Sequence, residues 1–339
     1  MRISGLSAAV PKGVITLDEG FFPFPQKEIQ AVCKMTGIQA LRRAGDEMCA
    51  SDLCAAAARE LFKSGLGHPQ DCDFLLFITQ TPDVLMPATA CMLQYRLGLR
   101  DDVLAFDLNK GCMGFTDGLL LAYSLIKGLR LRQGLLLVGD TYSKALEPSD
   151  RQTSLIFGDA GCAVWLEQTD NSEIKAFTFG TDGSGADSLT QRLGYRYGLS
   201  ACLKENKPLA SVGDPFLRMD GVEVFDFTLR RVPPMLHYVM AEAGWSYEEI
   251  DTFLLHQANL FIHKSIAKKM KHSLEKYPTS LERFGNTTVA SIPLTMSLLG
   301  RDFFQQPRKM VLAGYGIGLA WSAVAVESRS IEIPPLLEL

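Results

Sequence analysis

The chain is patterned as short, continuously apolar runs separated by longer stretches in which apolar and polar residues recur at helical spacing. Such short runs, rich in branched and aromatic residues, are typical of strands. Six of them stand out, at 74–78, 103–106, 135–138, 163–166, 252–255 and 310–313. Strands that lack polar positions are buried on both faces, so the pattern predicts an α/β fold in which helices are layered on sheets.

The stretches between these runs predict amphipathic helices, because their apolar residues return every three or four positions. The expected helices span about 51–64, 88–97, 113–128, 223–243, 258–271 and 291–300.

Parts of the second half of the chain echo the first half in the same order. Residues 64–77 align without gaps on 243–256, with the Gly and the Phe-Leu-Leu in register, and 135–139 resemble 310–314 at a similar offset. Buried strands often look alike, so one such pair would carry little weight. The segment around Cys112 also falls opposite Gly285-Asn286 at nearly the same offset. Three pairs in the same order predict two halves of similar topology, 1–170 and 171–339, that meet near residue 170.

Composition narrows the class of protein. With 339 residues, 47% of them hydrophobic, the chain can bury a large core. A net charge of −4 gives no general attraction to polyanions, so nucleic acid is not an expected partner. The N-terminus has no basic and apolar leader, and apolar stretches are interrupted well before membrane-spanning length, so we expect a cytoplasmic protein without a membrane partner.

The eight cysteines would suit four disulfides by number, but no CxxC pair or secretion signal supports such a framework. The five histidines do not stand near cysteines at the spacing of a structural zinc site, so no metal is expected. We therefore interpret most of the cysteines as small buried residues.

Cys112 has a different setting. It follows an apolar run and lies in a turn with Gly111 and Gly114, just before a predicted helix. A thiol at a helix N-terminus has its thiolate stabilised by free N–H groups and by the helix dipole, so its pKa is expected to fall toward neutrality. From this segment alone, a nucleophile and an ordinary buried cysteine are equally good interpretations.

Two further polar residues lie at the ends of predicted elements. His256 ends the apolar run 252–255, where an imidazole suits proton transfer or hydrogen-bond donation, although a lone histidine is usually structural. Asn286 lies in a turn before the helix expected at 291–300, and taken alone it would be a helix cap.

Taken together, these segments resemble the 3-oxoacyl-acyl-carrier-protein synthase III family, the initiating ketosynthases of bacterial fatty acid synthesis, in the thiolase superfamily. The resemblance covers nearly the whole chain. The residues that carry it are Thr36-Gly37-Ile38, Thr81-Pro82-Asp83, Pro87-Ala88-Thr89-Ala90-Cys91, the Cys112 turn, Ile156-Phe157-Gly158-Asp159-Ala160-Gly161, Met219-Asp220-Gly221, His256-Gln257-Ala258-Asn259, Gly285-Asn286-Thr287 and Gly314-Tyr315-Gly316-Ile317-Gly318. It implies a duplicated thiolase-like fold of five layers (α-β-α-β-α), usually a homodimer.

The resemblance also implies a mechanism. Cys112 would accept an acyl group from a thioester, with the backbone N–H groups of Cys112 and Ile317 as the oxyanion hole. His256 and Asn286 would donate hydrogen bonds to a malonyl thioester while it loses carbon dioxide and condenses with the acyl group. No cofactor is implied beyond the substrates, acyl-coenzyme A or an acyl carrier protein thioester and malonyl-carrier protein.

Other residues take their expected roles from the same resemblance. The substrate tunnel would be lined by Met86 (reached across the dimer), Phe157, Gly316 and Gly318. Docking of coenzyme A or of the acyl carrier protein would use Arg151, Lys264, Lys268 and Lys269. For the three lysines the alternative is an ordinary solvated helix face.

Several positions depart from the family pattern. Asn109, Lys110 and Gly111 replace an Ala-rich segment and place a cation beside the nucleophile. Ala31 and Met35 stand where a Trp and an Arg often contact the adenine of coenzyme A, and Phe261 replaces a basic residue. These changes leave fatty acid initiation and a specialised pathway both open.

Two other functions also stay open. The same acyl-cysteine could acylate an amine or a hydroxyl group without forming a carbon–carbon bond, or the chain could be a silent partner of an active synthase. Retention of Asn286 favours decarboxylation, and retention of Cys112, His256 and Asn286 together disfavours a silent subunit.

Overall fold

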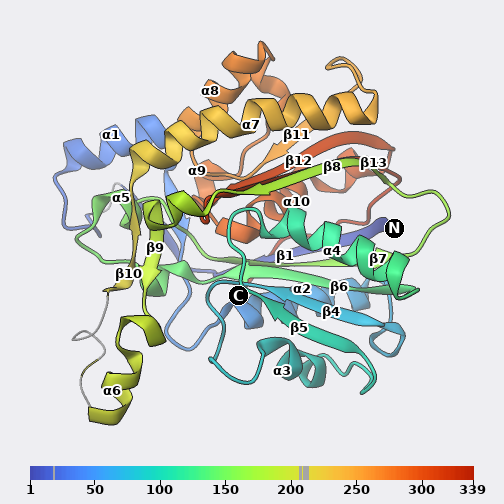
Figure 1. Cartoon of the computed structure of the whole chain (residues 1–339), viewed down its shortest axis with the longest axis horizontal. Helices are drawn as coiled ribbons and strands as arrows, with labels where there is room; N and C mark the ends of the chain where they lie inside the picture. The colour runs from blue at the N-terminus through green and yellow to red at the C-terminus, as the bar shows by residue number, and fades with distance from the viewer. Residues whose placement is uncertain (18–19, 206–207, 209–213) are drawn as a thin grey trace.

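The computed structural model describes residues 1–17, 20–205, 208 and 214–339, and two large sheets dominate them. The first sheet has the strand order β14-β1-β7-β6-β4-β5, and the second has the order β11-β12-β13-β8 (Figure 1). The strands of the first sheet are β1 (Arg2–Val10), β4 (Phe74–Ile78), β5 (Leu104–Leu108), β6 (Gln133–Asp140), β7 (Ala160–Glu167) and β14 (Leu337–Glu338). Those of the second are β8 (Ile174–Thr181), β11 (Thr252–Leu255), β12 (Arg308–Gly316) and β13 (Ala320–Ser328).

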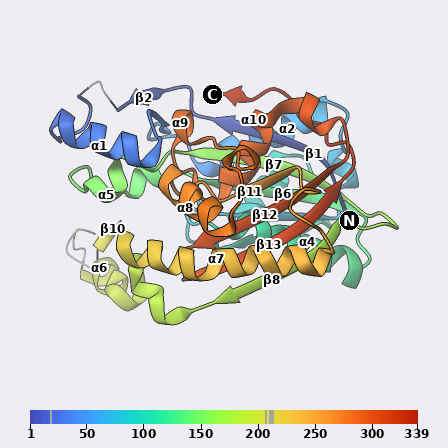
Figure 2. The same cartoon turned by 90° about the horizontal axis from the view of Figure 1, so that it is seen from above.

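Helices cover both sheets and fill the space between them, which gives the five layers that the sequence predicted (Figures 1 and 2). The middle layer is formed by α4 (Gly114–Gly128) and α10 (Ser291–Phe304). The outer face of the first sheet packs against α2 (Ala50–Lys63) and α3 (Thr89–Arg96), and the outer face of the second against α7 (Gly221–Ala243) and α8 (Leu260–Met270).

The strands are apolar at every position because each sheet is covered on both faces. Along β4, Phe74, Leu76 and Ile78 face the middle layer, whereas Leu75 and Phe77 face the layer of α2 and α3. All five side chains are fully buried. The alternation follows from the two-residue repeat of a strand, so one short run supplies two separate cores.

The two sheets repeat the same arrangement. β1 pairs antiparallel with β7, β7 antiparallel with β6, and β6 parallel with β4. β8, β13, β12 and β11 pair in the same order and with the same directions. The segments that echo each other in the sequence thus occupy equivalent strands, and the duplication that was predicted is present. The boundary near residue 170 stays a prediction, and β14, from the end of the chain, pairs with β1.

The predicted strands and helices are all present, with ends that move by a few residues for local reasons. Helix α7 begins earlier than expected because the Asp220 carboxylate accepts hydrogen bonds from the N–H groups of Val222 and Glu223. Helix α8 begins later because Asn259 caps it through the N–H of Ile262. Helix α10 continues beyond Gly300, which forms a kink within it.

The sequence pattern missed strands that are not continuously apolar. β1 and β13 are rich in Ala, Ser and Gly, which are weak strand formers, and β8 alternates buried and exposed residues. Smaller elements were also not predicted: β2 (Val14–Thr16), β3 (Ala40–Arg42), β9 (Leu189–Arg192), β10 (Asp214–Met219), α1 (Gln26–Thr36), α5 (Arg151–Ser154), α6 (Leu199–Glu205) and α9 (Leu281–Phe284).

Within the described ranges, no helix has the combined length and apolar content that a membrane crossing requires. The eight cysteines are all free thiols.

A buried carboxylate joins the two halves at the end of β6. Oδ1 of Asp140 accepts hydrogen bonds from Thr79 Oγ1 (3.0 Å), from the backbone N–H of Gln80 (2.7 Å) and from Thr81 Oγ1 (3.2 Å). The other oxygen, Oδ2, accepts the hydroxyl of Thr288, which comes from the second half of the chain. Burial raises the pKa of Asp140 to about 6, so the carboxylate is held where its charge is poorly solvated.

We expect this carboxyl group to make stability depend on pH between about 4 and 6. Because its pKa is higher in the folded than in the unfolded chain, its contribution to the free energy of unfolding is present below the unfolded pKa and is lost as the pH rises through about 6. The free energy of unfolding of the wild type, relative to Asp140→Asn, should fall by roughly 2–3 kcal/mol from pH 4 to pH 7 in urea titrations. Asp102→Asn, at an exposed position, serves as the control and should show no such trend. A wild-type advantage that stayed constant or grew with pH would contradict this assignment.

Candidate active site

Cys112 lies in the turn between β5 and α4, two residues before the helix begins, as the sequence predicted. Strand β12 approaches this turn so closely that only glycine fits. A Cβ atom on Gly314 would lie 2.4 Å from the Cα of Met113, and one on Gly316 would lie 2.8 Å from the Cys112 sulfur. The glycines of the C-terminal motif thus hold the second half of the chain directly against the thiol.

The thiol is shielded from water, with 7% of Cys112 exposed. Burial raises the pKa of Cys112 to about 11, although the backbone N–H groups of Ile317 and of Cys112 itself hydrogen-bond the sulfur and act in the opposite direction. The prediction of a thiol pKa near neutrality is therefore wrong for the unliganded chain, because desolvation outweighs the helix N-terminus. The sulfur is protonated at rest.

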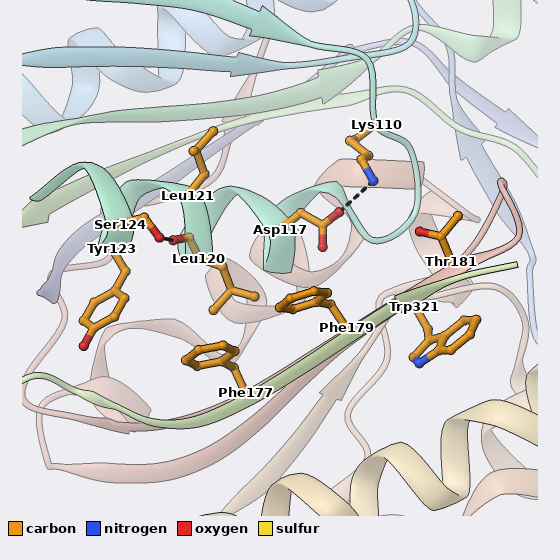
Figure 3. Close-up of a pocket in the computed structure, with 11 residues that line it drawn as sticks. Lys110, Asp117, Leu120, Leu121, Tyr123, Ser124, Phe177, Phe179, Thr181 and Trp321 are labelled. Atoms are coloured by element: carbon orange, nitrogen blue, oxygen red, sulfur yellow. Dashed lines mark hydrogen bonds and ion pairs between the residues drawn. The ribbon is translucent and has the colours of Figure 1, made fainter. Parts of the chain in front are cut away.

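The cation that Lys110 places next to Cys112 in the sequence is engaged by a neighbouring carboxylate. The Lys110 ammonium group lies 3.1 Å from Oδ2 of Asp117, on the first turn of α4. The pair borders an open hollow of about 320 Å³ between α4 and β8, where Phe179 lies opposite Leu120 (Figure 3). Neither Cys112, His256 nor Asn286 lines this hollow.

His256 is fixed by its backbone and by one ring nitrogen. Its N–H donates to the carbonyl of Ala313 on β12 (2.8 Å), and Nδ1 lies 2.8 Å from the Ser291 hydroxyl oxygen. Nδ1 is thus engaged, which leaves Nε2 as the ring nitrogen that can face a substrate. Burial lowers the pKa of His256 to about 3, so the imidazole is neutral at physiological pH.

Two side chains support His256 from behind. Its carbonyl oxygen accepts the hydroxyl hydrogen of Tyr315 (3.2 Å) and lies 3.0 Å from Nε2 of His263. The Tyr315 ring also packs edge-on against the imidazole, with 5.7 Å between ring centroids. Neither residue was assigned a role from the sequence, although Tyr315 lies within the C-terminal glycine motif.

Asn286 follows Gly285, which ends α9 with a φ of 63°, a conformation that favours glycine. The backbone N–H of Asn286 donates to the carbonyl of Ile156 (2.8 Å), and its side-chain Oδ1 accepts the N–H of Thr288 (2.9 Å). Asn286 therefore holds the first N–H of the short turn Thr288–Ala290. It does not cap α10, whose N-cap residue is Ala290, so the interpretation of Asn286 as a cap of that helix is wrong. Because Oδ1 is occupied, the Nδ2 amide group is the part of the side chain that remains to donate.

Thr288 and Val289 connect the segments that carry Cys112, His256 and Asn286. The carbonyl of Thr288 faces the His256 ring, and its N–H holds Asn286. Val289 packs against the start of α4, since its Cγ2 atom lies 2.7 Å from where a Cβ atom on Gly114 would be. The turn after Cys112, the end of β11 and the loop after α9 thus converge, although they lie far apart in the sequence.

The expected tunnel residues divide into two groups. Phe157 is buried and forms a parallel bridge with Asn286, and Gly316 touches the Cys112 sulfur. Gly318, with a φ of 139°, follows two residues later. Met86 is 79% exposed on the surface of this chain, so within a single copy it lines no enclosed space.

The expected docking residues lie at the surface. Lys264 and Lys268 are exposed on α8. The ammonium group of Lys269 donates to the carbonyl of Leu229 (2.8 Å), which ties α8 to α7. The guanidinium of Arg151 is paired with Glu28 of α1.

Several residues that shape the site were missed by the sequence interpretation. They are Gln80, Asp140, Tyr142, His263, Thr288, Ser291 and Tyr315. All of them act through a hydrogen bond to a partner that is distant in the chain or in another element. A buried polar residue at the end of an apolar run, as at Asp140, is the one signal that could have been noticed.

Comparison with known proteins agrees with this geometry. Residues 106–183 match the family model of 3-oxoacyl-[acyl-carrier-protein] synthase III, and residues 240–328 match the model of its C-terminal part. The β-ketoacyl-[acyl-carrier-protein] synthase III of Streptococcus gordonii is 35% identical over 330 residues, which are 96% of this chain and 98% of that protein.

Solved structures give the same result for the fold. The 3-oxoacyl-(acyl-carrier protein) synthase from Burkholderia xenovorans LB400 superimposes with a TM-score of 0.92 at 35% identity, covering 100% of this chain and 97% of that one. The priming β-ketosynthase of the R1128 polyketide pathway has a TM-score of 0.86 over 97% of this chain and 96% of its own, but at 24% identity it shows the fold alone. The chain belongs to the 3-oxoacyl-[acyl-carrier-protein] synthase III family, condensing enzymes of the thiolase superfamily.

Proposed function

We propose that Cys112 takes an acyl group from a thioester, and that a malonyl thioester then condenses with this group under the influence of His256 and Asn286 to give a 3-oxoacyl thioester. The observation that carries the proposal is the convergence of a shielded thiol with two neutral, buried hydrogen-bond donors. Family membership supports a condensing enzyme, and the geometry supports these roles for these residues.

In the first step, the Cys112 sulfur attacks the carbonyl carbon of the donor thioester. A bond forms between sulfur and carbon, the original thioester bond breaks, and the thiol proton ends on the departing thiol. The backbone N–H groups of Cys112 and Ile317 would hold the oxyanion, and their interaction with the sulfur supports this role. Each such donor typically lowers the barrier by about 3 kcal/mol.

In the second step, the malonyl thioester loses carbon dioxide, and the electron pair of the broken carbon–carbon bond forms an enolate. Nε2–H of His256 and Nδ2–H of Asn286 donate to the enolate oxygen. The carbanion attacks the acyl-cysteine, and the released Cys112 sulfur takes up a proton. Neutral donors suit this step because they stabilise charge that exists only at the transition state, whereas a carboxylate would repel it.

Neutral His256 can donate through Nε2 only if its one ring hydrogen is on Nε2, and Nδ1 is then a hydrogen-bond acceptor. Ser291 can donate this hydrogen bond, because its oxygen already lies 3.3 Å from the N–H of Gln257 and so has its own hydrogen left for Nδ1. Ser291 is therefore proposed as a positioning residue that selects the Nε2–H tautomer.

Docking of an acyl carrier protein is proposed on α8. The exposed ammonium groups of Lys264 and Lys268 support it, because carrier proteins of this type present acidic surfaces, although Phe261 beside them is apolar. Coenzyme A recognition has weaker support, since Ala31 and Met35 offer no cation and Arg151 is paired with Glu28.

A homodimer is proposed through the free edge of the first sheet. Strand β5 pairs only with β4 among the described strands, and an open strand edge readily pairs with a second copy. Exposed apolar residues, including Leu104 on this strand and Leu85 and Met86 nearby in the sequence, would be covered in such a contact. We place the activity in the cytoplasm, in fatty acid or specialised biosynthesis.

The central proposal is tested by intact-protein mass spectrometry after incubation with a panel of acyl-coenzyme A and acyl-carrier thioesters. We expect an adduct of the acyl mass on the wild type and none on Cys112→Ala. Added malonyl-carrier protein should then discharge the adduct with release of carbon dioxide. Asn286→Ala should retain the adduct while decarboxylation falls by roughly 10²–10³-fold.

The other outcomes point to the alternatives. An adduct that transfers to an amine or a hydroxyl group without carbon dioxide release would indicate simple acyl transfer. The absence of an adduct from every donor would contradict the acyl-enzyme and favour a silent subunit.

The role of Ser291 makes a separate prediction. Ser291→Ala should reduce malonyl decarboxylation by roughly 10–100-fold, because the wrong tautomer or ring orientation weakens the donor, while acylation of Cys112 changes little. Ser291→Thr should restore part of the rate. Ser297→Ala is the matched control on the same helix, since the buried Ser297 hydroxyl has no hydrogen-bond partner among the residues that the structure describes. Equal losses of acylation and decarboxylation in Ser291→Ala would indicate a purely structural role.

A further inference from the structure

Tyr142 is a buried phenol that the proposed reaction does not use. It follows β6 directly, is 4% exposed, and packs its ring against Phe157 with 5.9 Å between ring centroids. Burial raises the pKa of Tyr142 well above its ordinary value, and the nearby Cys112 and Asp140 act in the same direction. The phenol is therefore a neutral polar group in the neighbourhood of the nucleophile.

The hydrogen-bond partner of Tyr142 is Gln80, whose side chain lies beside the residue that precedes the nucleophile. The Tyr142 hydroxyl donates to Oε1 of Gln80 (2.9 Å). A Cβ on Gly111 would lie 2.3 Å from the same Oε1 atom and 2.7 Å from Cγ2 of Ile317. Gly111 directly precedes Cys112, and the N–H of Ile317 bonds its sulfur. The Gln80 amide thus lies beside the groups that surround the sulfur.

The Gln80 side chain is held in place from several sides. Its backbone N–H donates to Asp140 (2.7 Å), and its Nε2 donates to Oδ1 of Asn109 (3.1 Å). Hydrogen bonds therefore run in one direction, from Tyr142 to Gln80 and from Gln80 to Asn109. These bonds restrain the amide beside the Cys112 turn.

Gln80 and Tyr142 could each make a further hydrogen bond. The contacts described take one of the two hydrogens on Nε2 of Gln80, and the Tyr142 oxygen donates its hydrogen but retains lone pairs. A hydroxyl group could donate to the phenol oxygen, and an oxo group could accept from the amide. A plain alkyl chain in the same place would offer these groups no hydrogen bond, so its binding would gain less free energy than that of an oxygen-bearing chain.

We propose that Gln80 and Tyr142 form a starter-binding site that selects acyl groups with a hydroxyl or oxo oxygen within a few bonds of the thioester carbonyl over alkyl chains of the same shape. The inference rests on the proposed acyl-cysteine, because it concerns which group Cys112 accepts. Phe157 forms the apolar side of the same site and packs the carbon atoms of the starter.

The test compares donors that differ only by a hydroxyl in place of a methyl group: 3-hydroxybutyryl against 3-methylbutyryl thioester, and 4-hydroxypentanoyl against 4-methylpentanoyl thioester. Rates of Cys112 acylation are followed by intact-protein mass spectrometry. We expect the hydroxyacyl donor to react about tenfold faster in at least one pair, which is the effect of one net hydrogen bond. Tyr142→Phe and Gln80→Met should reduce this ratio to near one while the alkyl donors still react.

Tyr277→Phe is the matched control, because Tyr277 is also a buried phenol, bonded to His272 in the outer core of the second half. It should leave the ratio unchanged. Alkyl donors that react as fast as hydroxyacyl donors in both pairs would overturn the proposal, and so would a preference that survives in both Tyr142→Phe and Gln80→Met. Either result is distinct from failure of the proposed function, in which no donor gives an adduct.

Discussion

The close approach of β12 to the Cys112 turn is the contact on which the site depends. Gly314 and Gly316 let the backbone of the second half lie against the first, at distances where any side chain would collide. Because of this contact, the backbone N–H of Ile317 lies beside the sulfur. The contact also positions His256, whose backbone N–H donates to Ala313 of β12. The N–H groups of the proposed oxyanion hole and the imidazole therefore owe their positions to one packing arrangement between the two sheets.

Hydrogen bonds from Asp140 through Thr288 hold the third residue of the site, Asn286. Asp140, at the end of β6, binds Thr288, and Thr288 in turn holds the side chain of Asn286. Burying a carboxylate is unfavourable, and the raised pKa of Asp140 reflects it, but four hydrogen bonds compensate for part of the lost hydration. The same carboxylate positions the backbone of Gln80, so the proposed starter site and the donor site share one support.

Burial also sets the protonation states of the two titratable groups in the proposed reaction. It keeps Cys112 as a thiol and His256 as a neutral imidazole, because both charged forms are poorly solvated there. A neutral site suits a reaction in which negative charge appears only briefly, on an oxyanion and then on an enolate. It also means that acylation, which removes the thiol from this environment, involves no permanent buried charge.

The sequence by itself determined the layered α/β architecture and the duplication, and its resemblance to the family singled out the three residues proposed as central. Fully apolar runs such as 74–78 favoured strands covered on both faces, and the echo at 243–256 predicted an equivalent strand in the second half. Strands such as β1, with small residues, and the ends of α7 and α8 escaped the pattern because packing and side-chain caps decided them. Only the tertiary structure decided the thiol pKa, the pairing of Lys110 with Asp117, and the contacts of Asp140, Ser291 and Tyr142. Desolvation and hydrogen bonds between distant segments depend on which surfaces meet in space, and hydrophobic periodicity along the chain does not contain that information.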